Sequence, residues 1–576
     1  MATSSPNDAP GTPDGTSYSH PPCLELVDTP RRRYPWRWAI AVALFCGIVC
    51  VSIGTIVYFT PSPAHNASVK DIVSLIQTTP ALRVTITAKR STMHINGQST
   101  VHAYIVPRAN ERATVGATSL QFDAIMHVPS SETGVTETYT LVHDRAYWSV
   151  SHDDVVVDAG CMDASQVPPI SLMQSSLERS RTVAGVQFED GRDATPDCYD
   201  GTLLELSFAG ELFVFCASTT NQLTSATSDD MDIAVEYLAD GGLVPDVVVP
   251  RAANATASLR CPVVTTAALP STADMPLYES YTESTPVVVQ AKAASCGCKG
   301  EKKPCLFMHG LGESTSGPLE DTQADRWGDI HLHAPCCSSI KFAQVETVTR
   351  GWTDEAIQDE FCDAALHVAA DNDDESTVGR LILVTHSMGN LIAAGAVAND
   401  RCRFSDRVTW VSLAAPMSGS KTANYLDSKC KSHAWYDAAL KAILKMAGQC
   451  PTPTAVLHLQ DQCTADDEMQ AAYDAAQAVR RQHVTNMLCG TSSTGLVSFM
   501  SIATGIVASL TKFGKANDGV VDIESCQAGV GAYGFKGTPD AVHYQAAINH
   551  FDATFRYGDG WWGADRKPLK WFECAL

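Results

Sequence analysis

The sequence predicts an α/β fold with a mostly parallel sheet, preceded by a transmembrane helix and a β-rich domain. Three observations lead to this prediction. In the C-terminal half, short apolar runs enter turns that are followed by helix-like stretches, as in strand–helix units. Between residues 65 and 250, apolar and polar residues alternate with the two-residue period of half-buried strands. Near the N-terminus, the 22 residues from Trp38 to Phe59 carry no charge.

The segment Thr385-His386-Ser387-Met388-Gly389 combines three elements that together can activate a serine. It follows the apolar run Leu381–Val384 and precedes the helix-like stretch Asn390–Val397. A strand, a sharp turn carrying serine and a helix form a nucleophile elbow. Such a turn lifts the hydroxyl of Ser387 clear of the backbone and directs the next N–H toward a developing oxyanion. The usual motif has glycine where this chain has Thr385, so the motif is incomplete.

A second strand-to-turn junction lies upstream of this serine. The strand-like run Cys305–Met308 enters His309-Gly310-Leu311-Gly312. Glycine lets the backbone approach a substrate carbonyl closely, and a His-Gly segment after a strand can supply the second oxyanion-hole donor. The sequence therefore predicts an oxyanion hole made by the backbone N–H groups of Leu311 and Met388.

A carboxylate and an imidazole follow the serine in the order that such sites use. Asn517-Asp518-Gly519 precedes Asn549-His550-Phe551-Asp552. Serine is a weak nucleophile and needs a base within hydrogen-bond reach, and histidine titrates near neutrality. A carboxylate then fixes the imidazole tautomer. We therefore predict Ser387, Asp518 and His550 as the catalytic residues.

Alternatives remain open for two of the three positions. Asp461 follows the strand-like run Ala455–Leu459 and could replace Asp518, whereas His543 could replace His550. We expect His309 and His386 to orient the backbone around the site rather than to move protons.

Taken together, these motifs resemble the α/β-hydrolase lipases, and the Asn-Asp-Gly and Asn-His-x-Asp elements resemble the bacterial triacylglycerol lipases. The resemblance covers roughly residues 302–555. It implies an α/β-hydrolase fold in which Ser387 is the nucleophile, Asp518 the acid and His550 the base. Bacterial lipases also hold a structural calcium, and Asp552 matches one of its ligand positions. Because no clear second acidic ligand precedes Asp518, we expect neither a metal nor another cofactor.

The resemblance further implies a serine hydrolase that cleaves carboxylic esters, in particular lipid esters, through an acyl-enzyme. One alternative is a luminal acyltransferase of the lecithin–cholesterol acyltransferase type, which uses the same groups with an alcohol as the acceptor. Another is a catalytically silent ectodomain built on the hydrolase fold. The triad alone does not distinguish these functions.

The N-terminal region predicts a membrane anchor. Residues 1–35 are rich in Pro, Ser, Thr, Gly and Asp, as in a disordered tail. The following segment, residues 36–60, contains an apolar run that can cross about 30 Å of hydrocarbon. Four arginines between residues 31 and 37 precede the run, and the next basic residue is Lys70. The positive-inside rule then predicts a retained signal anchor with a cytosolic tail, that is, a type II single-pass membrane protein. A cleaved signal peptide is the alternative.

Composition agrees with a luminal or extracellular catalytic domain. Of the 20 cysteines, 17 follow the apolar run, as expected for disulfides in an oxidising compartment. Asn66-Ala67-Ser68 and Asn254-Ala255-Thr256 are glycosylation sequons. Cys296-x-Cys298 and Cys336-Cys337 lack the further ligands of a zinc site, so we predict that they form disulfides. A net charge of −23 argues against nucleic acid as a partner.

Residues 65–250 are predicted to form the β-rich domain, whose role the sequence does not indicate. Asn96-Gly97 predicts one hairpin. Asp240-Gly241-Gly242, between the strand-like runs Ile233–Leu238 and Val247–Val249, predicts another. Residues 251–300, rich in Ala, Thr, Ser and Pro, are interpreted as a linker.

The remaining residues, 301–576, are predicted to form the hydrolase domain, with a long insertion at Lys421–Gly514. Within it, Gly495–Leu510 is apolar but short for a membrane span. We interpret this stretch either as a lid or acyl-binding helix or as a buried core helix.

Overall fold

The computed structural model describes residues 63–108, 120–130, 134–252, 259–264, 287–431, 450–496 and 499–576. All of these belong to one compact unit, Thr60–Leu576. The predicted cytosolic tail, the predicted membrane span and the sequon at Asn254 lie outside the described residues. Within those ranges, no helix combines the length and apolar character that a membrane crossing requires.

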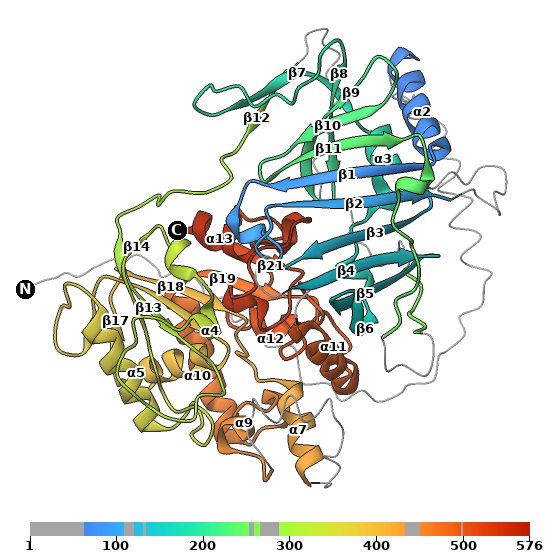
Figure 1. Ribbon diagram of the computed structural model, residues 1–576. Coiled ribbons are helices and arrows are strands. Elements are labelled where there is room, and N and C mark those ends of the chain that lie inside the picture. Colours follow the sequence, from blue (N-terminus) through green and yellow to red (C-terminus); the bar gives the residue numbers. More distant parts are fainter. Residues whose placement is uncertain are drawn as a thin grey trace, which may run out of the picture. The chain divides into compact units, whose positions relative to one another are not determined.

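The N-terminal part of this unit is built on a twelve-stranded sheet (Figure 1). Its order is β12-β7-β8-β9-β10-β11-β1-β2-β3-β4-β5-β6, and every neighbouring pair is antiparallel except β12 with β7. Two helices, α2 (Pro63–Thr78) and α3 (Met173–Glu178), pack apolar side chains against the sheet. The strands are β1 (Ala81–Ala88), β2 (Thr100–Pro107), β3 (Phe122–Pro129), β4 (Val135–Val142), β5 (Arg145–His152), β6 (Val155–Cys161), β7 (Arg181–Phe188), β8 (Thr202–Phe208), β9 (Glu211–Ala217), β10 (Leu223–Thr227), β11 (Met231–Leu238) and β12 (Val287–Ala291).

One of the two predicted hairpins is present. Asn96 and Gly97 both have positive φ, at 50° and 77°, and form a two-residue turn closed by an antiparallel bridge between Ile95 and Gln98. The second prediction is wrong, because Gly241–Leu243 forms a 3-10 helix and Val247–Val249 is not a strand. Its first strand, β11, is already paired on both sides by β10 and β1 and offers no free edge.

The structure also differs from the predicted linker at residues 251–300. Val287–Ala291 forms β12, which pairs in parallel with β7 at the edge of the sheet. This Val-Val-Val-Gln-Ala segment has the β-branched side chains that favour strands. The Ala, Thr, Ser and Pro around it obscured that signal.

The C-terminal part contains a seven-stranded sheet with the order β14-β13-β16-β18-β19-β21-β20. All neighbouring pairs are parallel, so the sheet is α/β-hydrolase-like, with β16 near its centre. A two-stranded sheet pairs β15 (Thr377–Val378) with β17 (Arg403–Phe404). The seven strands are β13 (Lys303–Met308), β14 (Cys337–Phe342), β16 (Leu381–His386), β18 (Val408–Leu413), β19 (Val484–Gly490), β20 (Phe535–Lys536) and β21 (His543–Ala546).

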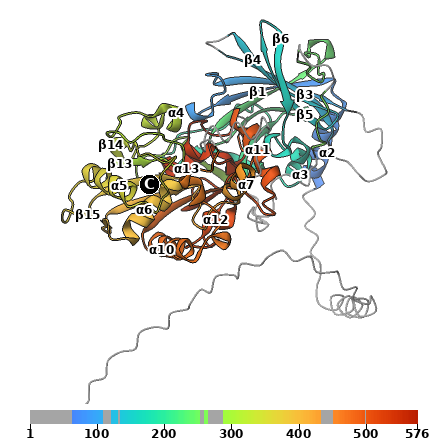
Figure 2. The same cartoon turned by 90° about the horizontal axis from the view of Figure 1, so that it is seen from below.

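Helices cover both faces of the parallel sheet (Figures 1 and 2). The strands are therefore buried on both sides, and their sequences are nearly continuous apolar runs. On one face, α5 (Glu355–Val368), α6 (Met388–Ala398) and α10 (Asp467–His483) pack together. The other face is covered by α4 (Ala324–Trp327) and α13 (Pro568–Ala575). The remaining helices are α7 (Lys421–Lys431), α9 (Thr454–Leu457), α11 (Phe499–Thr511) and α12 (Ile523–Gln527).

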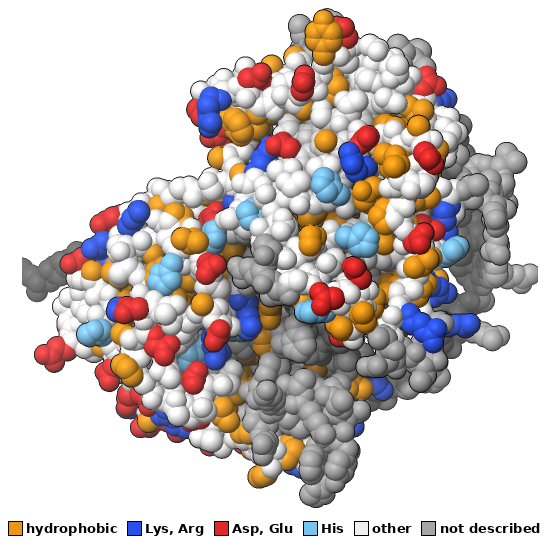
Figure 3. Space-filling view, in the orientation of Figure 1, with side chains coloured by type: hydrophobic (Ala, Val, Ile, Leu, Met, Phe, Trp, Pro, Cys, Tyr) orange, Lys and Arg blue, Asp and Glu red, His pale blue; other side chains and the backbone are white. Residues whose placement is uncertain are grey.

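Disulfides connect the described cysteines, as the sequence predicts for an extracellular or luminal domain. Cys296, Cys298, Cys336 and Cys337 each belong to a disulfide rather than to a metal site. The eight described pairs are Cys161–Cys261, Cys198–Cys216, Cys296–Cys574, Cys298–Cys336, Cys305–Cys337, Cys362–Cys402, Cys430–Cys450 and Cys489–Cys526. On the face seen in Figure 3, acidic side chains are spread among basic ones rather than gathered in one patch.

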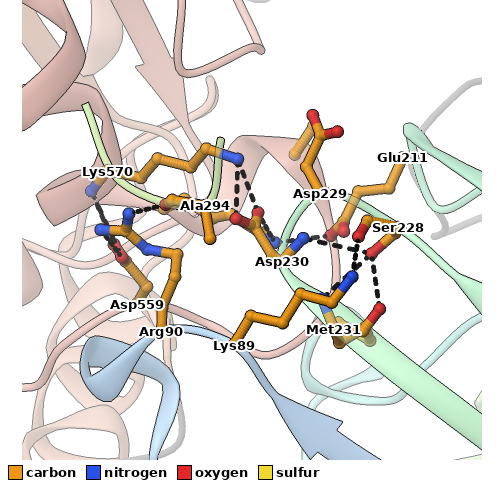
Figure 4. Close-up of polar contacts among 12 residues, drawn as sticks. Lys89, Arg90, Glu211, Ser228, Asp229, Asp230, Met231, Ala294, Asp559 and Lys570 are labelled. Carbon is orange, nitrogen blue, oxygen red and sulfur yellow. Dashed lines mark hydrogen bonds and ion pairs between the residues drawn. The ribbon is translucent and has the colours of Figure 1, made fainter. Parts of the chain in front are cut away.

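Buried charges join the twelve-stranded sheet to the C-terminal segment (Figure 4). Lys567 and Lys570 each place Nζ 2.7 Å from a carboxylate oxygen of Asp230. Arg90 Nη2 lies 3.3 Å from Asp559 Oδ2 and 3.0 Å from Glu573 Oε2. All six side chains are at most 10% exposed.

The lysine at position 567 remains charged despite its burial. Burial alone would lower its pKa, but Glu211 and Asp230 outweigh this effect and raise the pKa. Burial opposes the charge of Asp230 as well, yet Lys567 and Lys570 hold the pKa of its carboxyl below the usual range. A buried charge is tolerated only when it is paired in this way. The contact between the sheet and the C-terminal segment therefore requires both the lysines and Asp230.

We expect Asp559→Asn to destabilise the fold. Asp559 also accepts hydrogen bonds from Thr92 Oγ1 at 2.7 Å and from the N–H of Leu569 at 2.8 Å. Breaking a buried ion pair on one side costs at most about 3–5 kcal/mol, and Arg90 retains Glu573, so the loss should lie below that limit. Thermal unfolding measures it. The control is Asp190→Asn, which removes an exposed ion pair with Arg192 and should change the melting temperature little. Equal melting temperatures for both variants would contradict this prediction.

Candidate active site

Ser387 lies in a strained turn between β16 and α6. Its backbone has φ 52° and ψ −128°, a region that non-glycine residues rarely adopt. Hydrogen bonds hold the turn: the N–H of Ser387 donates to the carbonyl of Leu413 at 3.0 Å, and Asn390 Nδ2 donates to the carbonyl of Ser387 at 3.1 Å. This turn directs the serine hydroxyl toward the residues that follow the neighbouring strands.

The threonine that stands in the place of the usual glycine supports this turn. Thr385 is fully buried, and its hydroxyl donates to Asn390 Oδ1 at 2.6 Å while accepting from Trp410 Nε1 at 2.7 Å. Asn390 in turn donates to the carbonyls of Thr385, Ser387 and Leu413. The threonine therefore anchors the asparagine that bridges the two sides of the elbow.

The structure brings Ser387, His550 and Asp518 into one hydrogen-bonded chain. His550 Nε2 lies 2.9 Å from Ser387 Oγ, and His550 Nδ1 lies 2.8 Å from Asp518 Oδ2. All three side chains are buried. Because the carboxylate accepts from Nδ1–H, Nε2 carries the lone pair that faces the serine hydroxyl.

Parallel strands explain why residues so distant in sequence meet. Ser387 follows β16, Asp518 lies between β19 and β21, and His550 follows β21. The carboxyl ends of parallel strands share one edge of a sheet, where such sites form. The carboxylate is fixed further, because Asp518 Oδ1 accepts from the N–H groups of Val520 and Val521 at 2.9 and 2.7 Å.

The rival residues lie elsewhere. The predicted strand Ala455–Leu459 is wrong, since Thr454–Leu457 forms α9; a short apolar run does not distinguish a strand from a helix. Asp461 caps a 3-10 turn, where its side chain accepts from the N–H of Cys463 at 3.0 Å. His543 lies in β21 and packs its ring against Phe535.

Close backbone packing positions the two predicted oxyanion donors. A Cβ atom on Gly310 would lie 2.5 Å from Ser387 Cβ, and one on Gly389 would lie 2.4 Å from the carbonyl oxygen of His309. Both positions therefore require glycine for the two loops to touch. Met388 begins α6, so its N–H has no acceptor within the helix. Leu311 follows Gly310 on the facing loop.

A neutral histidine holds that facing loop. His309 is fully buried, its Nδ1 donates to the carbonyl of Gly310 at 2.8 Å, and its Nε2 accepts from the N–H of Val345 at 3.2 Å. Burial, assisted by the nearby Arg326 charge, lowers the pKa of His309 to about 3. His309 is therefore neutral at physiological pH, and both ring nitrogens are engaged with the backbone.

His386 holds the neighbouring backbone in a similar way. Its Nε2 donates to the carbonyl of His550 at 3.0 Å. Burial and the adjacent His550 ring hold the pKa of His386 well below its usual range. This hydrogen bond links the residue before Ser387 directly to the backbone of His550.

A buried carboxyl joins the histidine loop to the segment before α11. Asp552 Oδ2 accepts from the N–H of Asn549 at 2.9 Å and from the N–H of Leu496 at 2.8 Å. Burial raises the pKa of Asp552 to about 7. In the described part of the chain, no cluster of three or more His, Cys, Asp or Glu side chains is arranged to hold a metal ion.

Sequence reasoning missed several supporting residues. The sequence indicates Asn390 only as the start of a helix-like stretch and gives no sign of the role of Trp410, although both bind Thr385. The unusual threonine in the elbow was the available signal, because a buried hydroxyl requires polar partners. The partners themselves come from tertiary contacts.

We predict that Asp552→Asn changes how stability depends on pH. The Asp552 carboxyl titrates near pH 7 in the folded protein and near ~3.9 when unfolded, so the folded state binds more protons between these values. Stability of the natural chain should therefore fall as pH rises from about 4 to about 7, by at most on the order of 4 kcal/mol from this group. The variant lacks this contribution. Urea unfolding across that range measures the difference, and parallel curves would contradict the prediction.

Comparison with known proteins finds similar solved structures but no family. No family model matches the sequence, and no curated protein matches it either. Lipase 1 from Pelosinus fermentans is similar at 14% identity over 48% of this chain and 97% of that chain, with a TM-score of 0.27. Staphylococcus hyicus lipase is similar at 11% identity over 45% of this chain and 91% of that chain, with a TM-score of 0.26. A metagenomic carboxyl esterase is similar at 16% identity over 52% of this chain and 79% of that chain, with a TM-score of 0.27. The chain thus has structural similarity to lipases and esterases over roughly half its length, a similarity of fold alone.

Proposed function

We propose that this protein is a serine hydrolase that cleaves carboxylic esters, with lipid esters as the substrate class. The observation that carries the proposal is the hydrogen-bonded chain from Ser387 Oγ through His550 to Asp518, with separations of 2.9 and 2.8 Å. These separations lie within the reach that a nucleophile and its base require.

The reaction that this geometry supports proceeds through an acyl-enzyme. Ser387 Oγ attacks the ester carbonyl while His550 Nε2 takes its proton, and Asp518 stabilises the imidazolium. The N–H groups of Leu311 and Met388 stabilise the oxyanion. His550 then returns the proton to the leaving alcohol. A water molecule, deprotonated by the same nitrogen, releases the carboxylic acid and regenerates the serine.

An apolar helix beside the acid supports a lipid substrate. The sequence of α11 is mostly apolar, and Val507 on it is buried in the core. A Cβ atom on Gly519, next to Asp518, would lie 2.8 Å from Thr504 Cβ on this helix. The helix therefore packs on the loop that carries the acid, where a lid or acyl-binding helix would act.

The proposal extends to the compartment. Disulfides of this number favour an oxidising environment, so the catalytic domain belongs on the luminal or extracellular side. The apolar run Trp38–Phe59 would anchor it as a type II single-pass protein. Ester lipids are the substrates that a membrane-anchored hydrolase meets at high local concentration.

We expect Ser387→Ala to reduce ester hydrolysis by at least about 10⁴-fold, because the acyl-enzyme then does not form. The assay measures carboxylic acid released from esters of graded chain length and from phospholipids by the full-length protein. Ser428→Ala, which changes an exposed serine in α7, is the matched control and should retain full activity.

Fluorophosphonate labelling separates the remaining possibilities. Labelling at Ser387 without release of acid would indicate transfer of the acyl group to an alcohol. Absence of both in folded protein, or full activity in Ser387→Ala, would contradict the proposed function.

We expect Gly310→Ala to lower kcat by about 100- to 1,000-fold, the usual loss when one oxyanion donor is displaced. The added methyl group would clash with Ser387 Cβ and push the Leu311 N–H away. Gly300→Ala is the matched control, because a Cβ atom there meets nothing within 4 Å. A kcat of Gly310→Ala equal to that of the control would contradict the assignment of Leu311.

A further inference from the structure

A cavity of about 380 Å³ lies between the twelve-stranded sheet and the C-terminal segment. Its lining includes none of Ser387, Asp518 and His550. Protein interiors contain few voids larger than a water molecule. A volume of this size falls within the range of sites that bind small molecules, so a packing defect does not explain it.

Two rows of residues across neighbouring strands form the floor of the cavity. Strand register pairs Ile105 of β2 with Ala124 of β3, Ala124 with Leu141 of β4, and Leu141 with Ala146 of β5. All four line the cavity. Two residues along the strands, and therefore on the same face, lies a second lining row of Ala103, Met126 and Tyr139.

Small side chains create the hollow. Alanine is depleted in strands because it leaves a pleated surface unfilled, yet Ala103, Ala124 and Ala146 all line this face. A larger aliphatic side chain at any of them would occupy the space. This face of the sheet is therefore apolar and has a hollow about as deep as one side chain.

The hydrolase part of the chain supplies the opposite wall. Leu496, Tyr557, Trp561 and Trp562 line the cavity from this side. Trp562 is buried, and the Arg566 guanidinium lies over its ring at 4.2 Å from the centroid. The site therefore exists only where both parts of the chain meet, an interface held by the buried charges around Asp230 and Asp559.

Polar groups in the lining favour a neutral ligand. The charges of Asp559 and Arg566 in the lining already have partners, because Asp559 is paired with Arg90 and the charge of Arg566 is stabilised by Asp565 and Asp552. Glu137, which accepts a hydrogen bond from Tyr139, also lines the cavity and would repel a carboxylate. The two terminal nitrogens of Arg566 donate to the carbonyls of Gly495 and Ser165. Its buried Nε–H, however, has no acceptor among the described residues. One free donor beside an apolar hollow suits an ester carbonyl or a hydroxyl oxygen.

We propose that this cavity binds one acyl chain of a neutral ester lipid, with the ester or hydroxyl oxygens near Arg566 Nε–H. The site is separate from the serine, and the proposal stands whether or not the chain hydrolyses esters. Its apolar walls come from the alanine rows and the tryptophans, and burial of the acyl chain supplies the binding free energy.

The test is photolabelling of the full-length Ser387→Ala protein with a monoacylglycerol that carries a diazirine in its acyl chain. Peptide mass spectrometry should find label in β2–β5 or in residues 557–566, and an excess of unlabelled monoacylglycerol should remove it. Ala124→Phe should weaken this labelling by at least about tenfold, because its ring excludes two or more methylenes. Thr138→Phe, on the opposite face of β4, is the matched control and should label normally.

Each remaining outcome bears on the proposal. If Ala124→Phe fails to fold, Ala103→Leu in the second row replaces it with the same expectation. Label absent from the cavity, or unchanged in a folded cavity variant, would overturn the site. Stronger competition by a free fatty acid than by the monoacylglycerol would overturn the neutral ligand. Hydrolysis by the natural chain without cavity labelling would leave the proposed function standing and remove this site alone.

Discussion

The buried charge cluster between the sheet and the C-terminal segment is the constraint on which the other features depend. Lys567 and Lys570 share Asp230, and Arg90 binds Asp559, all away from water. The segment fixed in this way is short, yet residues 549–570 also contain His550 and part of the cavity wall. Ordering this one segment against the sheet therefore positions the histidine loop and closes the cavity together.

The sequence is most informative where the chemistry is local. Ser387 was predicted from five consecutive residues because a nucleophile elbow is defined by its own strand, turn and helix. Asp518 and His550 require chain order as well, and the sequence leaves Asp461 open as the acid; in the structure, Asp518 Oδ2 lies 2.8 Å from His550 Nδ1. Support from Trp410 and Asn390 was not predictable, because it depends on how neighbouring strands and helices pack.

The β-rich part shows the same limit on a larger scale. The two-residue period predicts strands between residues 65 and 250, such as β11, but it does not contain the order in which the strands pair. Only the register places Ile105, Ala124 and Leu141 in one row. Trp561 lines the same cavity, although it lies more than four hundred residues after Ile105 in the sequence. A cavity assembled from such distant segments has no motif in the sequence, whereas each strand that forms it has its own period-two pattern.

Asp552 connects the cavity with the loop that carries His550. Its Oδ2 accepts from the N–H groups of Asn549 and Leu496. Leu496 lines the cavity, and Asn549 precedes His550. Two hydrogen bonds to one carboxyl oxygen therefore span the distance between the cavity and the histidine loop. Because burial raises the pKa of this carboxyl to about 7, the strength of that connection depends on pH near neutrality.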